Sequence, residues 1–192
     1  MDRPTDNRTV MTQSAQARAR HRFTGDMRGV SAVEFALIVP LILLIFFAMV
    51  EVSQGLNANR KLTLTVRALS DLVAQATSVT STDVNNVFAA ASSIMQPFST
   101  VNLKSRISAI NIDASGVTKV DWSRGSGMSA RAKGDVVTIP AGLRIAGTQL
   151  IWSEAEYLFT PPVGYFLTGP ITMKDQFFAR PRQSNTVAGP TS

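Results

Sequence analysis

An uninterrupted apolar run, residues 36–50, constrains this chain more than any other feature of its sequence. The run reads Ala-Leu-Ile-Val-Pro-Leu-Ile-Leu-Leu-Ile-Phe-Phe-Ala-Met-Val and carries no charged or hydrogen-bonding side chain. Together with Val30–Phe35 it would form a helix about 30 Å long, the thickness of a bilayer's hydrocarbon core. A secretory signal peptide has a shorter apolar region that ends at a small-x-small cleavage site, whereas this run ends at Glu51 without one. We therefore predict a retained transmembrane helix over residues 30–51.

Basic residues are distributed unevenly about this predicted span. Residues 1–29 contain six arginines and three aspartates, whereas the first basic residues after the span are Arg60 and Lys61. An arginine excess beside the N-terminal end of a span places that end in the cytoplasm. We therefore expect a cytoplasmic N-terminus and an exported remainder. Half of the net charge of +6 belongs to the leader, so the exported part is only weakly basic and no nucleic-acid partner is expected.

A single carboxylate, Glu34, lies near the start of the apolar segment. An ionisable residue inside a membrane span is costly and therefore indicates a function. Glu34 stands five positions after Gly29, and a polar, arginine-rich leader precedes that glycine. Cleavage between Gly29 and Val30 would free an α-amine that this carboxylate could neutralise, in the same chain or in a neighbour. The alternative is a signal-anchor helix whose first turns simply tolerate an acid.

Beyond the span, the apolar periodicity predicts helices first and strands afterwards. One helix face carries apolar residues at spacings of four, three and four: Leu62, Val66, Leu69 and Val73. This pattern breaks over residues 77–81, where Ser81 or Thr82 is expected to cap a second helix that ends by Pro97. The period then changes to two, and strands are expected over residues 103–112, 117–122, 136–139, 149–160 and 171–179. This order predicts an α+β fold with a long N-terminal helix, a short second helix and an antiparallel sheet.

The chain is thus expected to comprise five segments. They are a cytoplasmic basic leader over residues 1–29, a transmembrane helix over 30–51, a helical stalk with the second helix over 52–96, a β-rich exported domain over 97–183 and a flexible tail over 184–192.

Residue types that most catalytic and metal sites require are scarce. The chain has no cysteine, and its one histidine, His21, lies in the leader. Thiol chemistry, imidazole triads and metal sites built on histidine or cysteine are therefore excluded from the exported part. Glu154 and Glu156 would share one face of a strand, which could hold a cation or work as an acid–base pair, but a solvated strand face explains them more simply. We expect no enzymatic activity, no cofactor and no metal.

Several other patterns have structural explanations that we prefer. Asp113–Gly116 is typical of a hairpin turn, and the glycine-rich segment 123–127 is typical of a flexible surface loop rather than a phosphate cradle. A small basic cluster falls in one loop and would suit DNA uptake only as a remote alternative: Arg124, Arg131 and Lys133. Six aromatic residues are expected to pack in the core, with a subunit surface as the alternative: Tyr157, Phe159, Tyr165, Phe166, Phe177 and Phe178.

The segment that begins at Gly29 resembles the TadE/TadG-like pseudopilin family of the Tad/Flp (type IVc) pilus system. The resemblance rests on Gly-Val-Ser-Ala-Val-Glu-Phe-Ala-Leu over residues 29–37, on Pro40 within the apolar run and on Glu51 at its end. The ending Phe-Ala-Arg-Pro-Arg over residues 178–182 is also similar to that of family members. The resemblance implies that a prepilin peptidase cuts between Gly29 and Val30. It further implies that Glu34, followed by Phe35, is the carboxylate used in recognition and assembly.

This resemblance implies a role in pilus biogenesis. The chain would be a minor or pseudopilin subunit in the bacterial inner membrane, with a periplasmic C-terminal domain. Its partners would be membrane lipid, the prepilin peptidase, other pilin and pseudopilin subunits and the assembly platform. The major pilins of this system are very small, so the large exported part argues against a major subunit. An uncleaved, single-pass periplasmic accessory or binding factor is the alternative.

Larger proteins of this group can carry a von Willebrand-type domain with an Asp-x-Ser-x-Ser metal site. Here Asp113 and Ser115 match its first half, but Val117 stands where the second serine belongs. The hairpin turn is therefore the better explanation of this segment.

Overall fold

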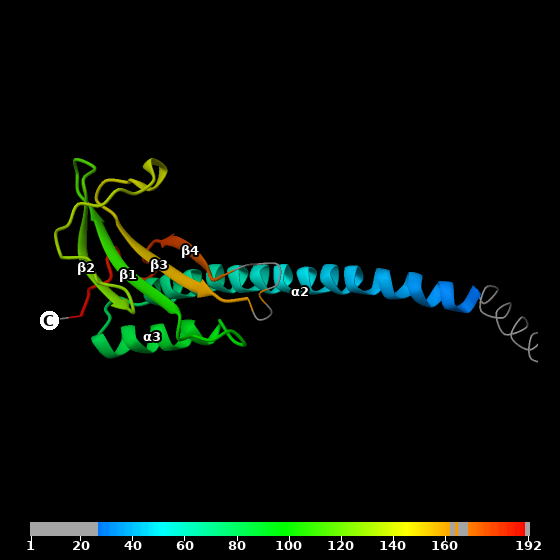
Figure 1. The fold of residues 1–192 in the computed structure, drawn as a ribbon. Coiled ribbons are helices and arrows are strands. Elements are labelled where there is room, and N and C mark those ends of the chain that lie inside the picture. The colour runs from blue at the N-terminus through cyan, green and yellow to red at the C-terminus, as the bar shows by residue number, and fades with distance from the viewer. Residues whose placement is uncertain (1–26, 162–163, 165–168, 191–192) are drawn as a thin grey trace, which may run out of the picture. The chain divides into compact units, whose positions relative to one another are not determined.

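The structure is a computed structural model that describes residues 27–161, 164 and 169–190 (Figure 1). Most of the predicted leader therefore lies outside the described residues. The elements follow in the order α2 (Met27–Ala74), α3 (Ser81–Ser93), β1 (Leu103–Ile112), β2 (Thr118–Ser126), η1 (Ala141–Leu143), β3 (Gln149–Phe159) and β4 (Ile171–Ala179). The predicted α+β class is confirmed. The chain forms two compact units, Met1–Phe47 and Ala48–Ser192.

In the first unit, the described residues form the N-terminal part of α2. The helix continues through Pro40, and no residue between Gly29 and Phe47 is buried. Apolar side chains face outward all around it, which in water would be unfavourable and which suits a lipid environment or an assembly of helices. Among the described residues, this is the one helix long and apolar enough to cross a membrane.

The second unit packs its helices against an antiparallel four-stranded sheet of order β2-β1-β3-β4. The predicted apolar stripe of α2 forms the helix side of the core, because Leu62, Val66, Leu69 and Val73 are each at most 1% exposed. Leu69 and Val73 share a cluster with Ile107 of β1, and Leu62 and Val66 share one with Tyr157 of β3. The stripe read from the sequence is therefore the surface that attaches the helix to the sheet.

A third cluster covers the opposite face of the sheet. It contains Ile110 of β1, Leu150 and Trp152 of β3, and Ile139 from the segment between β2 and β3. The members from β1 and β3 lie there because side chains alternate along a strand, but the β1–β2 register shifts between Ala109 and Ile110. Across the shift, Trp122 pairs with Ala109 on the helix face while Val120 pairs with Ile110 on the outer face. The extra β2 residue between Val120 and Trp122 forms a bulge. Because of it, Val120 and Trp122 lie on opposite sides of the sheet although they are two positions apart.

Buried hydroxyl groups join α2 to the central strand β3. Ser153 donates to the carbonyl oxygen of Val66 at 2.6 Å, and its Oγ lies 2.6 Å from the Oγ of Ser70. Both serine residues are fully buried. Since a buried polar group costs free energy unless it is hydrogen-bonded, these contacts favour one axial position of the helix on the sheet.

Three local expectations need correction. The cap of α3 is Thr80 rather than Ser81 or Thr82, because a capping box links the Thr80 hydroxyl to the amide of Asp83 and the Asp83 carboxylate to the amide of Thr80. Residues 136–139 do not form a strand; they bond to the edge of β2 through an isolated bridge at Val136. The glycine-rich segment 123–127 is largely the end of β2 rather than a loop.

The expected flexible tail is also wrong for residues up to Gly189, because the sheet and helix ends bind it. The amide of Val187 donates to Gln149 Oε1 at 2.7 Å, and the Val187 carbonyl accepts from Trp122 Nε1 at 2.9 Å. The Val187 side chain is fully buried. A Cβ on Gly189 would lie 2.2 Å from the Trp122 ring, so only glycine fits there. Upstream, the amide of Arg182 caps the carbonyl of Ala74, near the end of α2, at 2.8 Å.

Candidate functional site

The predicted processing and assembly residues lie together at the start of α2. Gly29, Val30, Glu34 and Phe35 are all helical and exposed, Val30 by 56% and Phe35 by 68%. Val30 and Glu34 are four residues apart and therefore lie on the same side of the helix, one turn from each other. A Cβ on Gly29 would meet no atom within 4 Å. Within the first unit, the described residues therefore leave this segment uncovered.

A second polar site lies on the outer face of the sheet, where Glu154 of β3 is held between two arginines. Arg106 of β1 donates from Nε and Nη2 to the two carboxylate oxygens at 2.9 and 3.0 Å. Arg131, from the loop after β2, donates from Nη2 at 2.9 Å and also from Nη1. The three side chains are only 15–18% exposed. Glu154 is therefore a structural ion-pair centre and not part of the solvated strand face that was expected.

The same arginines fasten the loop after β2 to the sheet. Arg131 also donates to Ser108 Oγ at 3.2 Å, and its guanidinium lies 3.7 Å from the centroid of the Trp152 ring. Arg106 donates to the carbonyl oxygen of Ser129 at 3.0 Å. Cation–π stacking and charge-assisted hydrogen bonds act here on one partly buried group, which strengthens both.

Arg131 and Arg106 also control the titration of Glu154. Burial alone would raise the pKa of the Glu154 carboxyl, but the hydrogen bonds and charges of the two arginines outweigh burial and hold the pKa below its ordinary value. A carboxyl whose pKa is lower in the folded than in the unfolded protein stabilises the fold when the pH is above its unfolded pKa. This stabilisation is lost as the pH falls from the unfolded pKa through the folded pKa.

We therefore predict an acid-dependent loss of stability that depends on Glu154. The urea midpoint of the full chain in detergent, followed by tryptophan fluorescence, should fall as the pH drops below the ordinary carboxyl value of 4.5. Glu154→Gln should be less stable at neutral pH but should lose less stability on acidification. Asp83 and Asp113 also have lowered pKa values, set mainly by hydrogen bonds from Thr80 and Ser115. Both aspartates are present in the original chain and in Glu154→Gln, so their contribution cancels when the two are compared. If acid lowers the stability of the two proteins equally, Glu154 is not the group responsible.

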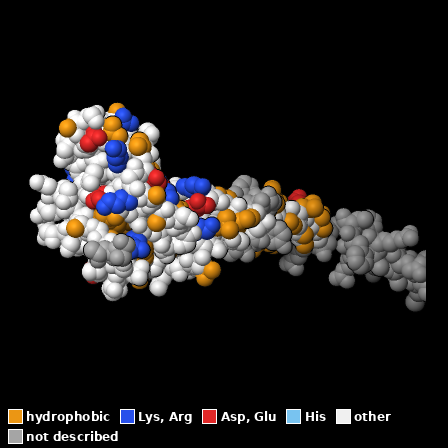
Figure 2. Space-filling view, turned by 90° about the vertical axis from the view of Figure 1, so that its left-hand side faces the viewer, with side chains coloured by type: hydrophobic (Ala, Val, Ile, Leu, Met, Phe, Trp, Pro, Cys, Tyr) orange, Lys and Arg blue, Asp and Glu red, His pale blue; other side chains and the backbone are white. Residues whose placement is uncertain are grey.

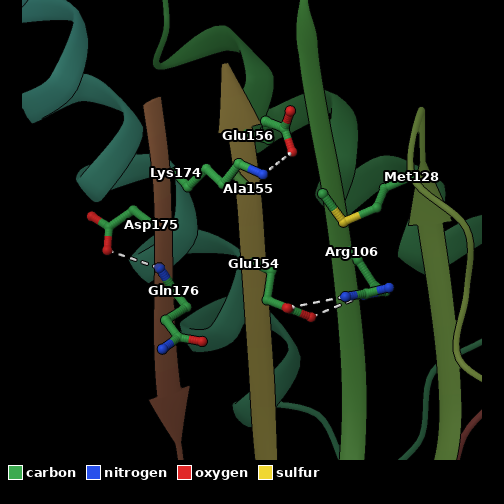
Figure 3. Close-up of a pocket in the computed structure, with 8 residues that line it drawn as sticks. All are labelled: Arg106, Met128, Glu154, Ala155, Glu156, Lys174, Asp175 and Gln176. Atoms are coloured by element: carbon green, nitrogen blue, oxygen red, sulfur yellow. Dashed lines mark hydrogen bonds and ion pairs between the residues drawn. The ribbon is translucent and has the colours of Figure 1, made fainter. Parts of the chain in front are cut away.

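Beside the Glu154 site, an open groove of about 640 Å³ runs over β3 and β4 (Figure 3). Glu156 shares the outer face with Glu154, as the sequence predicted, but it pairs separately with Lys174 at 3.2 Å. Lys174 is 70% exposed and Glu156 30% exposed, so water screens this pair and it contributes little stability. The described residues contain no group of three or more acidic, histidine or cysteine side chains placed to hold a metal ion.

The remaining candidate residues have structural partners. Arg124 donates to Ser81 Oγ at 3.2 Å and Lys133 pairs with Asp121 at 3.4 Å, so with Arg131 bound to Glu154 the three cations do not form a free cluster. On the face that Figure 2 draws, lysine and arginine side chains are spread among acidic and uncharged ones. The Asp113 carboxylate accepts the amide of Val117 and the hydroxyl and amide of Ser115. The predicted hairpin turn is confirmed.

The aromatic residues do not form one cluster. Tyr157 and Phe159 are buried on the helix face, and Phe177 packs against them. Phe178 stacks on Trp152 on the outer face, with ring centroids 5.3 Å apart. Tyr165 and Phe166 lie outside the described residues. Core packing is thus confirmed for the described members, and strand alternation divides them between the two faces.

These features define a class of α+β protein. Of the described helices, one is long and apolar enough to anchor the protein once in a membrane. Residues 29–70 match the family model described as TadE-like protein. This segment of the chain is therefore similar to the TadE-like family, and the match ends within α2, before the sheet domain begins. Neither the curated proteins nor the solved structures yielded a match.

Proposed function

We propose that this chain is a minor, pseudopilin-type subunit of a Tad-type pilus or a related secretion machine. It is anchored in the bacterial inner membrane by α2, with its N-terminus in the cytoplasm and its sheet domain in the periplasm. One observation carries the proposal. The TadE-like match begins at Gly29, at the residue where the arginine-rich leader meets the exposed apolar helix.

In this proposal a prepilin peptidase cleaves between Gly29 and Val30. The new α-amine and the Glu34 carboxylate then form a compensated pair in the membrane, within one chain or between neighbours. Pairing matters because an isolated carboxylate in hydrocarbon is costly. The exposed apolar surface of the helix supports the proposal, since it provides area for packing against other pilin-like helices and lipid.

We further propose that the role is structural and not catalytic. Glu154, a largely buried carboxylate, is saturated by two arginines whose hydrogen bonds favour its charged form. A general acid or base needs a proton that it can exchange near the working pH. A carboxylate with a lowered pKa and occupied oxygens is poorly suited to that task.

The decisive measurement is the N-terminus of the mature protein. Intact-mass and N-terminal peptide analysis of membranes from cells with an active prepilin peptidase should find Val30 as the first residue. Cells that lack the peptidase should retain the leader. A chain that keeps residues 1–29 in peptidase-positive cells would contradict the pilin-type proposal and favour the uncleaved accessory factor.

Glu34 provides a second test that separates processing from assembly. Glu34→Gln keeps the shape of the side chain but removes its charge, so pilus assembly should fall strongly because the α-amine loses its counter-charge. Lys119→Gln, which removes an exposed charge from β2 of the sheet domain, is the control and should assemble normally. Normal piliation by Glu34→Gln would remove the role assigned to this carboxylate.

A further inference from the structure

The two edge strands of the sheet, β2 and β4, differ in whether other segments of the chain bond to their outer edges. Along the outer edge of β2, the segment 134–137 bonds to the backbone: Val120 donates to Asp135 at 2.9 Å, Gly134 donates to Val120 at 2.7 Å, and Val137 donates to Thr118 at 3.1 Å. Within the described residues, no backbone group other than those of β3 bonds to β4. The β2 edge is therefore covered, whereas the described backbone leaves the outer edge of β4 open.

One contact shows which backbone amides and carbonyls of β4 point away from β3. The amide of Gln176 donates to the side chain of Asp175 at 2.8 Å, on the side of the strand away from β3 (Figure 3). Backbone groups alternate in direction along a strand, and the β3–β4 register has no shift. The amides and carbonyls of Thr172, Lys174 and Phe178 therefore point outward as well.

We propose that this edge of β4 binds an extended segment of a different polypeptide, which extends the sheet by one strand. Main-chain hydrogen bonds to an open edge supply affinity in this mode, and pockets for alternate side chains supply specificity. The groove described above lies directly beside the edge and contains Glu156 and Lys174. Side chains from one face of an added strand would lie next to this groove. The proposal does not depend on cleavage at Gly29 or on entry into a fibre.

Charge indicates the chemistry of the added strand. Lys174 pairs with Glu156 of β3 on one side and is still 70% exposed, so a carboxylate placed opposite it on the new strand would form a second cross-strand pair on its other side. The face of β4 that carries Lys174 also carries Thr172, Gln176 and Phe178, none of which is acidic. A second copy pairing through its own β4 could not supply this carboxylate.

The possible two-fold registers also disfavour a second copy. Antiparallel self-pairing centred on Lys174 or on Asp175 would place that residue opposite its own like charge, which is destabilising. Centred on Met173 or on Gln176, it would place Lys174 opposite Thr172 or Phe178, neither of which is acidic. We therefore assign the edge to a strand from another protein, with an acidic residue opposite Lys174.

Residue-resolved amide exchange tests this assignment. The full chain purified in detergent would be compared with the same chain in native membranes that contain its partner proteins. The outward amides of Lys174 and Phe178 should exchange at least about tenfold more slowly in native membranes. An added strand supplies new backbone hydrogen bonds to these amides whether it runs parallel or antiparallel to β4. The amides of Met173 and Phe177, which point toward β3, should not change. Unchanged exchange at both outward amides would overturn the proposal.

Lys174→Glu reverses the charge that should select the partner. It should abolish the slowing at Phe178, while Lys174→Ala should reduce it. Lys119→Glu, an exposed cation on β2, is the matched control and should keep the slowing. Tryptophan fluorescence verifies that each variant is folded. Equal slowing in Lys174→Glu would contradict the charge assignment, and slowing in the purified chain alone, together with dimerisation, would identify a second copy and overturn the choice of partner.

Discussion

Replacing Glu154 by alanine is expected to lower the free energy of unfolding of the sheet domain by about 3 kcal/mol, because it leaves two partly buried guanidinium groups without a counter-charge. Arg106 and Arg131 both bond to this carboxylate and are 18% and 15% exposed. Without Glu154 they would repel each other, and the loop that carries Arg131 would lose its main attachment to the sheet. Urea unfolding of the full chain, followed through Trp122 and Trp152, measures the change.

The neighbouring carboxylate supplies the control for this experiment. Glu156→Ala removes a residue two positions along the same strand face, but its pair with Lys174 is exposed. Exposed pairs contribute at most about 1 kcal/mol, so this variant should remain close to the original stability. Similar losses in Glu154→Ala and Glu156→Ala would show that burial of the ion pair is not what matters at this site.

A loss of about 2–5 kcal/mol is expected when Leu62 is replaced by alanine, the range for deleting a large side chain from a packed core. Leu62 is fully buried between α2 and the sheet, beside Ala58, Val66 and Tyr157. The cavity would weaken the surface through which the helix and the sheet are joined. The same urea experiment reports it, together with faster exchange of the β3 amides.

Leu64→Ala is the matched control for Leu62→Ala. Leu64 lies two residues further along α2 and is 48% exposed on the side away from the sheet. Its removal deletes the same atoms without opening a core cavity, so stability should change by about 0.5 kcal/mol or less. If both leucine variants lose equal stability, the assigned packing face of α2 is wrong.

Periodicity in the sequence predicted the helices and three of the four strands within about three residues. The signal was strong there because one face of each element is buried, which restricts apolar residues to a fixed spacing. It failed where long-range contacts decide the backbone. β2 continues to Ser126 and residues 136–139 are not a strand, because the segment after β2 bonds along its edge. Val187 is a single apolar residue in a polar tail, so no local pattern indicated that it is buried.

The candidate sites were predictable to different degrees. Gly29 and Glu34 could be selected from sequence because an acid inside an apolar run stands out by composition alone. Glu154 and Glu156 were placed on one strand face correctly, but their different environments were not foreseen. Arg106 and Arg131 lie 48 and 23 residues from Glu154 in the chain. Only the β1–β3 register and the fold of the loop bring them to one carboxylate.

The apolar run, the leader and the position of Glu34 are local properties, and by themselves they indicate a membrane helix and a processing signal. Local composition has this power because the free energy of placing a helix in lipid depends on its own residues. The Glu154 ion-pair site, the bound tail and the open β4 edge are different. Each depends on which distant segments meet, and that is decided by burial and hydrogen bonding of the whole sheet domain, which no stretch of sequence contains by itself.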